Sequence, residues 1–275
     1  MQRLLSLFLI ITMVCIHSIG ARAQLAFDAR TQWDASTCAS SMVYQTSIRA
    51  VNQLGELELS DGRTLNLVGL DFKKNDQKRA VIEAQLHTII ALQSLVRVYM
   101  WHKEPDRWGR TLGDVVIPLG ESTASLSAMM IDGDFAFVQP NPALSTLCIH
   151  ALKSIEVQAR AAKRGVWAHD DWLLHASQNF NSTDVSRFEG TFAIMEGRVH
   201  SVGVRKNATY LNFGVFGSQA LTVVIAPRIW LALEEQGLNR KRLKNAKVQV
   251  RGVLEKRRTL TMRIHHVEDV DILGD

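Results

Sequence analysis

The alternation of apolar and polar residues in the first half of the chain predicts short β-strands. Runs of alternating or mostly apolar residues cover positions 44–51, 56–59 and 64–70. The tight-turn dipeptide Asp61-Gly62 lies between the second and third runs, so these two strands are expected to form a hairpin.

Helical and strand patterns follow one another in the rest of this half. An apolar stripe at helical spacing predicts a helix over residues 76–92. Two strands and two further helices come next: strands over 96–101 and 111–117, and helices over 122–131 and 141–164. Gly165 is in the C-cap position of the last helix. Five strands with helices at these places predict a small closed barrel of the oligonucleotide/oligosaccharide-binding (OB) type.

The second half shows a similar order of elements after residues 169–187, a polar segment without a clear period that we interpret as a linker. From residue 188 the pattern predicts strands over 190–202, 209–216, 221–225, 247–254, 259–266 and 270–273, and a helix over 227–236. One helix between the third and fourth strands again fits a five-stranded barrel. The predicted fold class is a β-rich α+β protein with two OB-like barrels in tandem, in domains covering 24–168 and 188–275.

Residues 1–23 have the three parts of a secretory signal peptide. Arg3 precedes an uncharged apolar run over residues 4–16, and an A-x-A cleavage site ends at Ala23. A membrane anchor would need about 20 apolar residues, whereas this uncharged stretch has 17 residues and includes a histidine. A lipoprotein would need a small residue before Cys15, where the chain has a valine. We therefore expect cleavage, a periplasmic or secreted protein, and no transmembrane segment in the mature chain.

The mature chain retains two cysteines, Cys38 and Cys148. An even pair in an oxidising compartment favours one disulfide. The other interpretation is two separate buried thiols. Neither a CxxC nor an HxxxH spacing occurs in the sequence, so no motif for a metal site is present.

Composition and charge narrow the class of protein. A chain of 275 residues with 47% hydrophobic and 21% charged residues is typical of one or two globular domains. With 17 glycines and 5 prolines, it is neither collagen-like nor a Pro/Gly-rich disordered chain. The net charge of +5 is unevenly distributed, because residues 188–275 hold 14 Lys and Arg against 9 Asp and Glu. A polyanionic partner would therefore meet the second domain.

Three sequence blocks resemble the thermonuclease (staphylococcal-nuclease-like) family, over residues 44–168 or so. They are LELSDGRTLNLVGLD at 57–71, DRWGRTL at 106–112 and EVQARAAKRGVW at 156–167. The second block is similar to the family's D-[RK]-[YW]-G-R-x-L hairpin, and the third to its terminal helix. The resemblance implies that the first barrel is nuclease-like and carries three helices.

Members of that family hydrolyse phosphodiester bonds in DNA and RNA, typically with one calcium ion. Two aspartates hold the cation, a glutamate positions water, and two arginines bind the phosphate oxygens. Matched residue by residue, only Asp71 and Arg110 retain the family's residue type. The other three positions hold Gly55 for an aspartate, Asn66 for an arginine and Lys74 for the glutamate.

This pattern predicts that calcium-dependent hydrolysis is lost. One carboxylate is a poor site for an ion that takes six to eight oxygen ligands, and Lys74 would repel a cation. The alternative is an active nuclease with a rearranged metal site built on Asp71, Glu56 or Asp76, with Arg110 on the phosphate. Glu56 would need a β-bulge to reach that site, because adjacent residues of a strand face opposite sides. Asp76 fits better as the cap of the following helix.

The retained residues also have structural interpretations. Asp71 fits a strand-end acceptor for backbone donors of the next loop, and Arg110 fits an ion pair with Asp106 in its hairpin. For three further residues packing or ion pairing is favoured over contact with nucleic acid: Trp108, Trp167 and Glu156.

The second domain carries the candidate binding residues. Its cations cluster at Arg240, Lys241, Arg242, Lys244 and Lys247, and again at 256–258. A basic groove with aromatic side chains suits single-stranded nucleic acid. The candidate aromatics are Tyr210, Phe213 and Phe216, and strand alternation would put the first and third on one face. A solvated basic loop is the structural interpretation, and an acidic protein or an anionic envelope surface is another partner for such a cluster.

The sequence thus predicts an exported homologue of the thermonuclease family that has lost hydrolysis and binds nucleic acid or a protein. The alternative is an active nuclease with a rearranged site, and a third interpretation is an envelope module with a structural role alone. No cofactor is expected, and calcium is expected only if the rearranged site is active.

Overall fold

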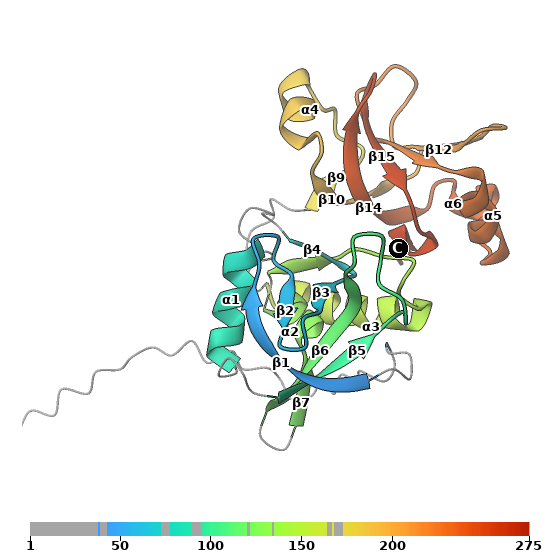
Figure 1. Ribbon diagram of the computed structural model, residues 1–275. Coiled ribbons are helices and arrows are strands. Elements are labelled where there is room, and N and C mark those ends of the chain that lie inside the picture. Colours follow the sequence, from blue (N-terminus) through green and yellow to red (C-terminus); the bar gives the residue numbers. More distant parts are fainter. Residues whose placement is uncertain are drawn as a thin grey trace, which may run out of the picture.

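The computed structural model of this chain describes residue 38 and residues 43–72, 78–89, 95–119, 122–133, 135–163, 167 and 173–274. The signal peptide predicted at 1–23 and the helix cap predicted at Gly165 lie outside these residues. The described residues form two β-rich units (Figure 1).

The first unit is a closed barrel. Its strands are β1 (Val43–Val51), β2 (Leu57–Leu59), β3 (Thr64–Leu67), β5 (Leu95–Met100) and β6 (Thr111–Leu119). Neighbouring strands pair antiparallel in the order β3-β2-β1-β5-β6. A parallel pairing of β3 with β6, which aligns Leu65 with Thr111, closes the ring. The predicted hairpin around Asp61-Gly62 is confirmed, and the inward side chains of the five strands fill one buried core.

Two predicted elements of this unit are corrected. The run at 64–70 is not one strand, because Gly69 turns the chain at φ +86° and packs so closely on Leu144 that a Cβ would clash. The residues beyond it form β4 (Leu70–Phe72), which pairs with β8 (Ala136–Val138). The predicted helix at 122–131 begins as β7 (Ser122–Ser125) and continues as α2 (Leu126–Asp132), whose N-terminus Ser125 caps.

Two helices complete the first unit. Helix α1 (Lys78–Ile89) follows β4, and α3 (Thr146–Ala161) is shorter than the predicted helix at 141–164. The Ser145 hydroxyl accepts a hydrogen bond from the backbone N–H of Cys148 and so sets the start of α3. One face of α3 packs into the barrel core through Ile149, Leu152 and Ile155.

The predicted disulfide is confirmed. Cys38 and Cys148 are bonded across a sequence separation of 110 residues, and both side chains are buried. The bond ties the segment that precedes β1 to α3, so it joins the start of the first unit to its last helix.

The second unit is a curled sheet. Its strands are β9 (Leu173–His175), β10 (Phe192–Arg198), β11 (Ser201–Val204), β12 (Thr209–Asn212), β13 (Thr222–Ile225), β14 (Lys247–Lys256), β15 (Leu260–Ile264) and β16 (Val270–Ile272). The order is β11-β12-β13-β15-β14-β10-β9, with β16 beside β14. Strands β13 and β15 are parallel, as are β9 and β10. The predicted strand at 190–202 is therefore two strands, which lie at separate positions in the sheet.

Three helices accompany this sheet: α4 (Ser182–Phe188), α5 (Pro227–Glu235) and α6 (Arg240–Leu243). Helix α5 lies between β13 and β14 in the sequence, as predicted, while α6 is a single helical turn in a region expected to be a loop. A short 3₁₀ helix, η5 (Val267–Asp269), precedes β16.

The segment at 169–187 is not a simple linker. Strand β9 pairs with β10, and Asn181 caps α4 in a reciprocal capping box with Asp184. Phe180 and Val185 are buried in the core of the second unit. These contacts join residues from 173 onward to the second unit, although their sequence shows no clear period.

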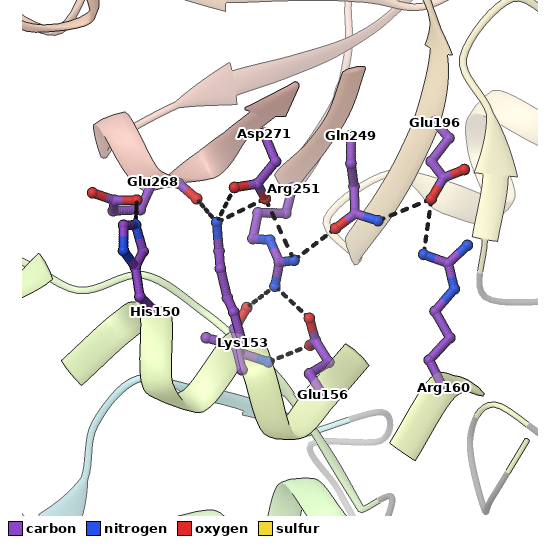
Figure 2. Close-up of polar contacts among 10 residues, drawn as sticks. His150, Lys153, Glu156, Arg160, Glu196, Gln249, Arg251, Glu268 and Asp271 are labelled. Atoms are coloured by element: carbon purple, nitrogen blue, oxygen red, sulfur yellow. Dashed lines mark hydrogen bonds and ion pairs between the residues drawn. The ribbon is translucent and has the colours of Figure 1, made fainter. Parts of the chain in front are cut away.

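A buried arginine links the two units (Figure 2). Arg251 of β14 is 2% exposed, and its Nη1 donates to Glu156 Oε2 of α3 and to the backbone oxygen of Val138, both at 2.9 Å. The other carboxylate oxygen of Glu156 accepts from the Val138 backbone N–H at 2.7 Å. The structure thus confirms that Glu156 is an ion-pair partner.

Further polar contacts extend this link on both sides of Arg251 (Figure 2). Arg251 Nη2 donates to Gln249, which donates to Glu196, and that carboxylate pairs with Arg160 of α3 at 2.8 Å. On the other side, Lys153 of α3 contacts Asp271 at 2.7 Å, and His150 contacts Glu268 at 2.7 Å. Every one of these ion pairs joins α3 to an element of the second unit.

An apolar cluster completes the junction. Phe137, Ala159 and Trp167 of the first unit are buried together with Ile194 of β10. The Phe137 and Trp167 rings meet edge to face, with centroids 5.3 Å apart. Trp167 therefore has the packing role that the sequence favoured.

We predict that reducing the disulfide destabilises the protein. The chain-entropy model assigns about 4–5 kcal/mol of unfolding free energy to a crosslink that closes a loop of this length. Urea unfolding of the mature protein, with and without reductant, measures this loss. In the Cys38→Ser/Cys148→Ser variant the reductant should have no effect, and an unchanged midpoint for the reduced wild-type chain would contradict the prediction.

We also predict that the contribution of Glu196 to stability depends on pH. Burial opposes its charged form, but the hydrogen bonds from Arg160 and Gln249 prevail and lower its pKa from the usual 4.5. A carboxylate whose pKa is lower in the folded state stabilises the protein above the unfolded pKa, and this stability is lost as pH falls through the folded pKa. Glu196→Gln should therefore cost about 1–3 kcal/mol at pH 7, and the difference from wild type should shrink below about pH 4.5.

Urea unfolding at a series of pH values between neutral and acid tests this trend. Glu58→Gln is the matched control, because its partner Arg49 is 68% exposed and an exposed pair contributes little. If the difference in unfolding free energy between Glu196→Gln and wild type stays constant down to pH 3 or so, this linkage is ruled out.

Candidate functional site

The closed barrel brings Arg110 and Glu56 together. Glu56 immediately precedes β2 and Arg110 immediately precedes β6, and both strands pair with β3. Arg110 Nη1 donates to Glu56 Oε1 at 2.8 Å. The two residues lie 54 positions apart in the sequence, so only the ring of strands makes this contact.

Arg110 also holds its own hairpin, as the sequence predicted. Its Nε and Nη2 contact Asp106 Oδ2 at 2.8 and 2.7 Å, while Asp106 Oδ1 accepts the backbone N–H groups of Trp108 and Arg110. Gly109 has φ +76°, which a residue without a Cβ adopts at no cost. The D-R-W-G-R block is therefore a hairpin that is stabilised by contacts among its own residues. Asp106, Trp108, Gly109 and Arg110 each contribute to this structure.

The electrostatics of this cluster favour the paired state. The hydrogen bond to Asp106, followed by that to Glu56, raises the pKa of Arg110 although burial opposes it. Burial also opposes the charge of Asp106, but hydrogen bonds from Arg110 and Trp108 lower its pKa. One guanidinium thus faces two carboxylates, and a phosphate could bind Arg110 only by displacing them.

Both carboxylate oxygens of Glu56 accept hydrogen bonds within the protein. Its side chain is 6% exposed, and its second oxygen accepts from the Asn52 side chain at 2.8 Å. The expectation that Gly55 and Glu56 lie in a strand is wrong, because Gly55 has φ +69° in the turn that precedes β2. That turn directs Glu56 to Arg110 rather than to a cation.

Two of the remaining positions expected from the resemblance lie in described strands. Asn66 lies in β3, and Asp71 lies half-buried in β4 opposite Phe137 of the β4–β8 pair. Lys74 and Asp76 are outside the described residues. Within the part of the chain that the structure describes, no three His, Cys, Asp or Glu side chains gather as a metal site would require.

The cations of the second unit form a separate site, which we call the cationic pocket. It is an open hollow of about 670 Å³ beside α6, with Arg198, Lys241, Arg242, Lys244 and Lys247 in its lining. None of the residues that line it in the described chain is acidic. Four of the five predicted basic residues therefore meet at one hollow, and Arg240 lies next to them in α6 without lining it.

Local structure arranges these cations. The Asn239 side chain accepts the backbone N–H of Arg242 and starts α6, and Asn245 turns the chain at φ +65° into β14. Arg198 at the end of β10 donates to the Asn245 backbone oxygen at 2.7 Å. Sequence analysis missed Arg198 because it lies far from the basic cluster in the chain, although a charge at a strand end is a recognisable signal.

The candidate aromatics have three different environments. Phe213 is 3% exposed and belongs to the core of the second unit, so it is not a binding residue. Tyr210 is 37% exposed on β12. Phe216 is fully exposed, but it lies in a loop beyond the end of β12, so the expected strand alternation does not reach it. Trp108, which was expected to pack, is 62% exposed with the Arg107 and Arg110 guanidinium groups against its ring.

The chain was compared with known proteins. No family model matches it, and no curated protein does. None of the helices described in the structure is long and apolar enough to cross a membrane. A functional assignment therefore rests on the geometry of the two sites.

We predict that Arg110→Ala destabilises the first unit by about 2–3 kcal/mol, because it leaves the buried carboxylate of Glu56 unpaired. Urea unfolding measures this loss. The control is Arg49→Ala, whose exposed pair with Glu58 should account for less than about 1 kcal/mol. A stable Arg110→Ala protein would show instead that the arginine is available for a ligand.

Proposed function

We propose that this chain is an exported protein of the thermonuclease type that has lost calcium-dependent phosphodiester hydrolysis and binds single-stranded nucleic acid through its second unit. The observation that carries the proposal is the cationic pocket, where Lys241, Arg242, Lys244 and Lys247 line one hollow together with Arg198, and where none of the described lining residues is acidic. Such a positive hollow attracts a phosphodiester backbone.

Strand topology supports an OB-type assignment for both units. In the first unit the barrel strands β1, β2 and β3 precede α1, and β5 and β6 follow it. In the second unit β10 to β13 precede α5, with β10 and β11 together in the place of the first strand, and β14 and β15 follow α5. The first strand pairs antiparallel with the fourth, as β1 with β5 and β10 with β14. The third pairs parallel with the fifth, as β3 with β6 and β13 with β15. Barrels of this type commonly bind oligonucleotides.

The two ion pairs of Arg110 support the proposed loss of hydrolysis. A phosphate would have to compete for Arg110 with the carboxylates of Glu56 and Asp106, which contact all three nitrogens of its guanidinium group. Glu56, the nearest substitute for a missing metal ligand, is held by the same arginine and by Asn52. The disulfide supports export, since such bonds persist in oxidising compartments.

We predict that the double variant Lys241→Glu/Arg242→Glu weakens binding of a labelled oligothymidylate by about tenfold or more at low salt. Each reversed cation removes a phosphate contact, so the dependence of affinity on salt should also become shallower. Fluorescence anisotropy over a salt series with the full mature chain measures both effects. The control is Lys103→Glu, a reversal on an exposed residue of the first unit, which should leave affinity nearly unchanged.

In a second experiment the wild-type mature protein is incubated with single- and double-stranded DNA and RNA, in calcium, magnesium or manganese and in chelator. We expect intact nucleic acid in every case. Chelator-sensitive cleavage that disappears in Asp71→Ala would overturn the proposed loss of hydrolysis and establish the rearranged metal site. Absence of oligonucleotide binding would overturn the binding function.

A further inference from the structure

A second hollow lies on the outer face of the second unit, at strands β11, β12 and β13. Its volume is about 440 Å³, and its floor is formed by Ser201, Asn212 and Thr222. These three residues lie side by side on β11, β12 and β13, because Ser201 is in register with Asn212 and Asn212 with Thr222. The Asn212 amide donates to the Ser201 hydroxyl at 3.1 Å. The floor therefore consists of small polar groups that can donate and accept hydrogen bonds.

An aromatic side chain stands at the rim of this hollow. The loop between β12 and β13 forms one wall and carries Phe216, whose ring is fully exposed. A turn with Gly217 at φ +86° and a backbone hydrogen bond from Ser218 to Val215 places Phe216 at the tip. A fully exposed phenylalanine contributes nothing to the core, and both faces of its ring are accessible from outside the chain.

A second aromatic ring follows on the same face. Tyr210 lies two residues before Asn212 on β12, so both side chains point outward, roughly 6.7 Å apart along the strand. Its neighbour on β11 is Gly203, where a Cβ would meet only the Tyr210 Cβ, at 4.0 Å. The ring of Tyr210 is therefore open on the side of the glycine.

Cationic side chains frame this face at both ends. Arg205 and Lys206 are exposed in the turn between β11 and β12. Arg258, in the turn between β14 and β15, lines the hollow opposite the Phe216 loop. Arg263 of β15 lies in the same cross-strand row as Tyr210, with Val224 between them, but it pairs with Glu255 at 3.4 Å. The face thus combines two exposed rings, a polar floor and cations on both sides.

We propose that this face, which we call the aromatic groove, binds the unpaired bases of single-stranded nucleic acid, with Tyr210 and Phe216 as stacking platforms. The inference rests on the proposed function and gives the strand a second contact region besides the cationic pocket. Bases stack on aromatic rings only when they are unpaired, and flanking arginines bind the phosphates between them. The polar floor fits base edges better than lipid chains, which offer no hydrogen-bonding groups.

The test compares four variants of the full mature chain by fluorescence anisotropy with a labelled oligothymidylate of about 15 nucleotides. Tyr210→Ala and Phe216→Ala should each weaken binding by about fivefold or more, with an unchanged salt slope because no cation is lost. Tyr210→Phe keeps the ring and should bind like wild type. Gly203→Leu places a side chain over the open side of the Tyr210 ring and should weaken binding as Tyr210→Ala does.

Circular dichroism and thermal unfolding confirm that each variant is folded, and Gly203→Ala is the matched control for the glycine. If Tyr210→Ala and Gly203→Leu bind the oligonucleotide as well as wild type does, the proposal for the aromatic groove is wrong and that for the cationic pocket is retained. If wild type does not bind the oligonucleotide at all, both proposals fail. If Phe216→Ala abolishes binding to vesicles containing phosphatidylserine and leaves oligonucleotide binding unchanged, the loop contacts membranes and the groove proposal is wrong.

Discussion

The joint between the two units depends on one buried charge. The Arg251 guanidinium has left water almost completely, and an unpaired charge there would cost several kcal/mol. It is accommodated because Glu156 and the Val138 backbone oxygen come from the first unit, while Gln249 comes from its own strand. Neither unit alone provides this set of partners. The second unit is thereby attached to α3 of the first unit.

Helix α3 therefore connects the first unit to the second. Glu156 and Arg160 belong to the sequence block that resembles the terminal helix of the thermonuclease family, and both pair with the second unit. Lys153 contributes a third contact, where burial, together with the nearby charge of Arg251, lowers its pKa although Asp271 opposes the shift. The same helix carries Cys148 of the disulfide. Family-like residues at these positions are therefore explained by the architecture without any catalytic role.

The cationic side chains of the two units have different surroundings. In the first barrel, Arg110 lies between two carboxylates, and its charge is neutralised within the protein. In the second unit, the cations that line the hollow beside α6 have no acidic side chain among the described lining residues. A polyanion would gain little at the first site, where the charge of Arg110 is already neutralised, and more at the second, where the described lining residues are basic or uncharged. We therefore place the proposed binding function in the second unit.

Local chemistry in the sequence was sufficient for most elements and for the disulfide. Strands that alternate, the Asp61-Gly62 turn and the pairing of Cys38 with Cys148 depend on neighbouring residues or on a count, so they could be predicted. The break at Gly69 could not, because it arises from close packing on Leu144, which is distant in the chain. The contact of Glu56 with Arg110 likewise requires the ring of strands to close. The burial of Arg251 could not be predicted either, because its partners Glu156 and Val138 come from the other unit. Tertiary structure alone decided these points, since each is a contact between residues that only folding brings within reach.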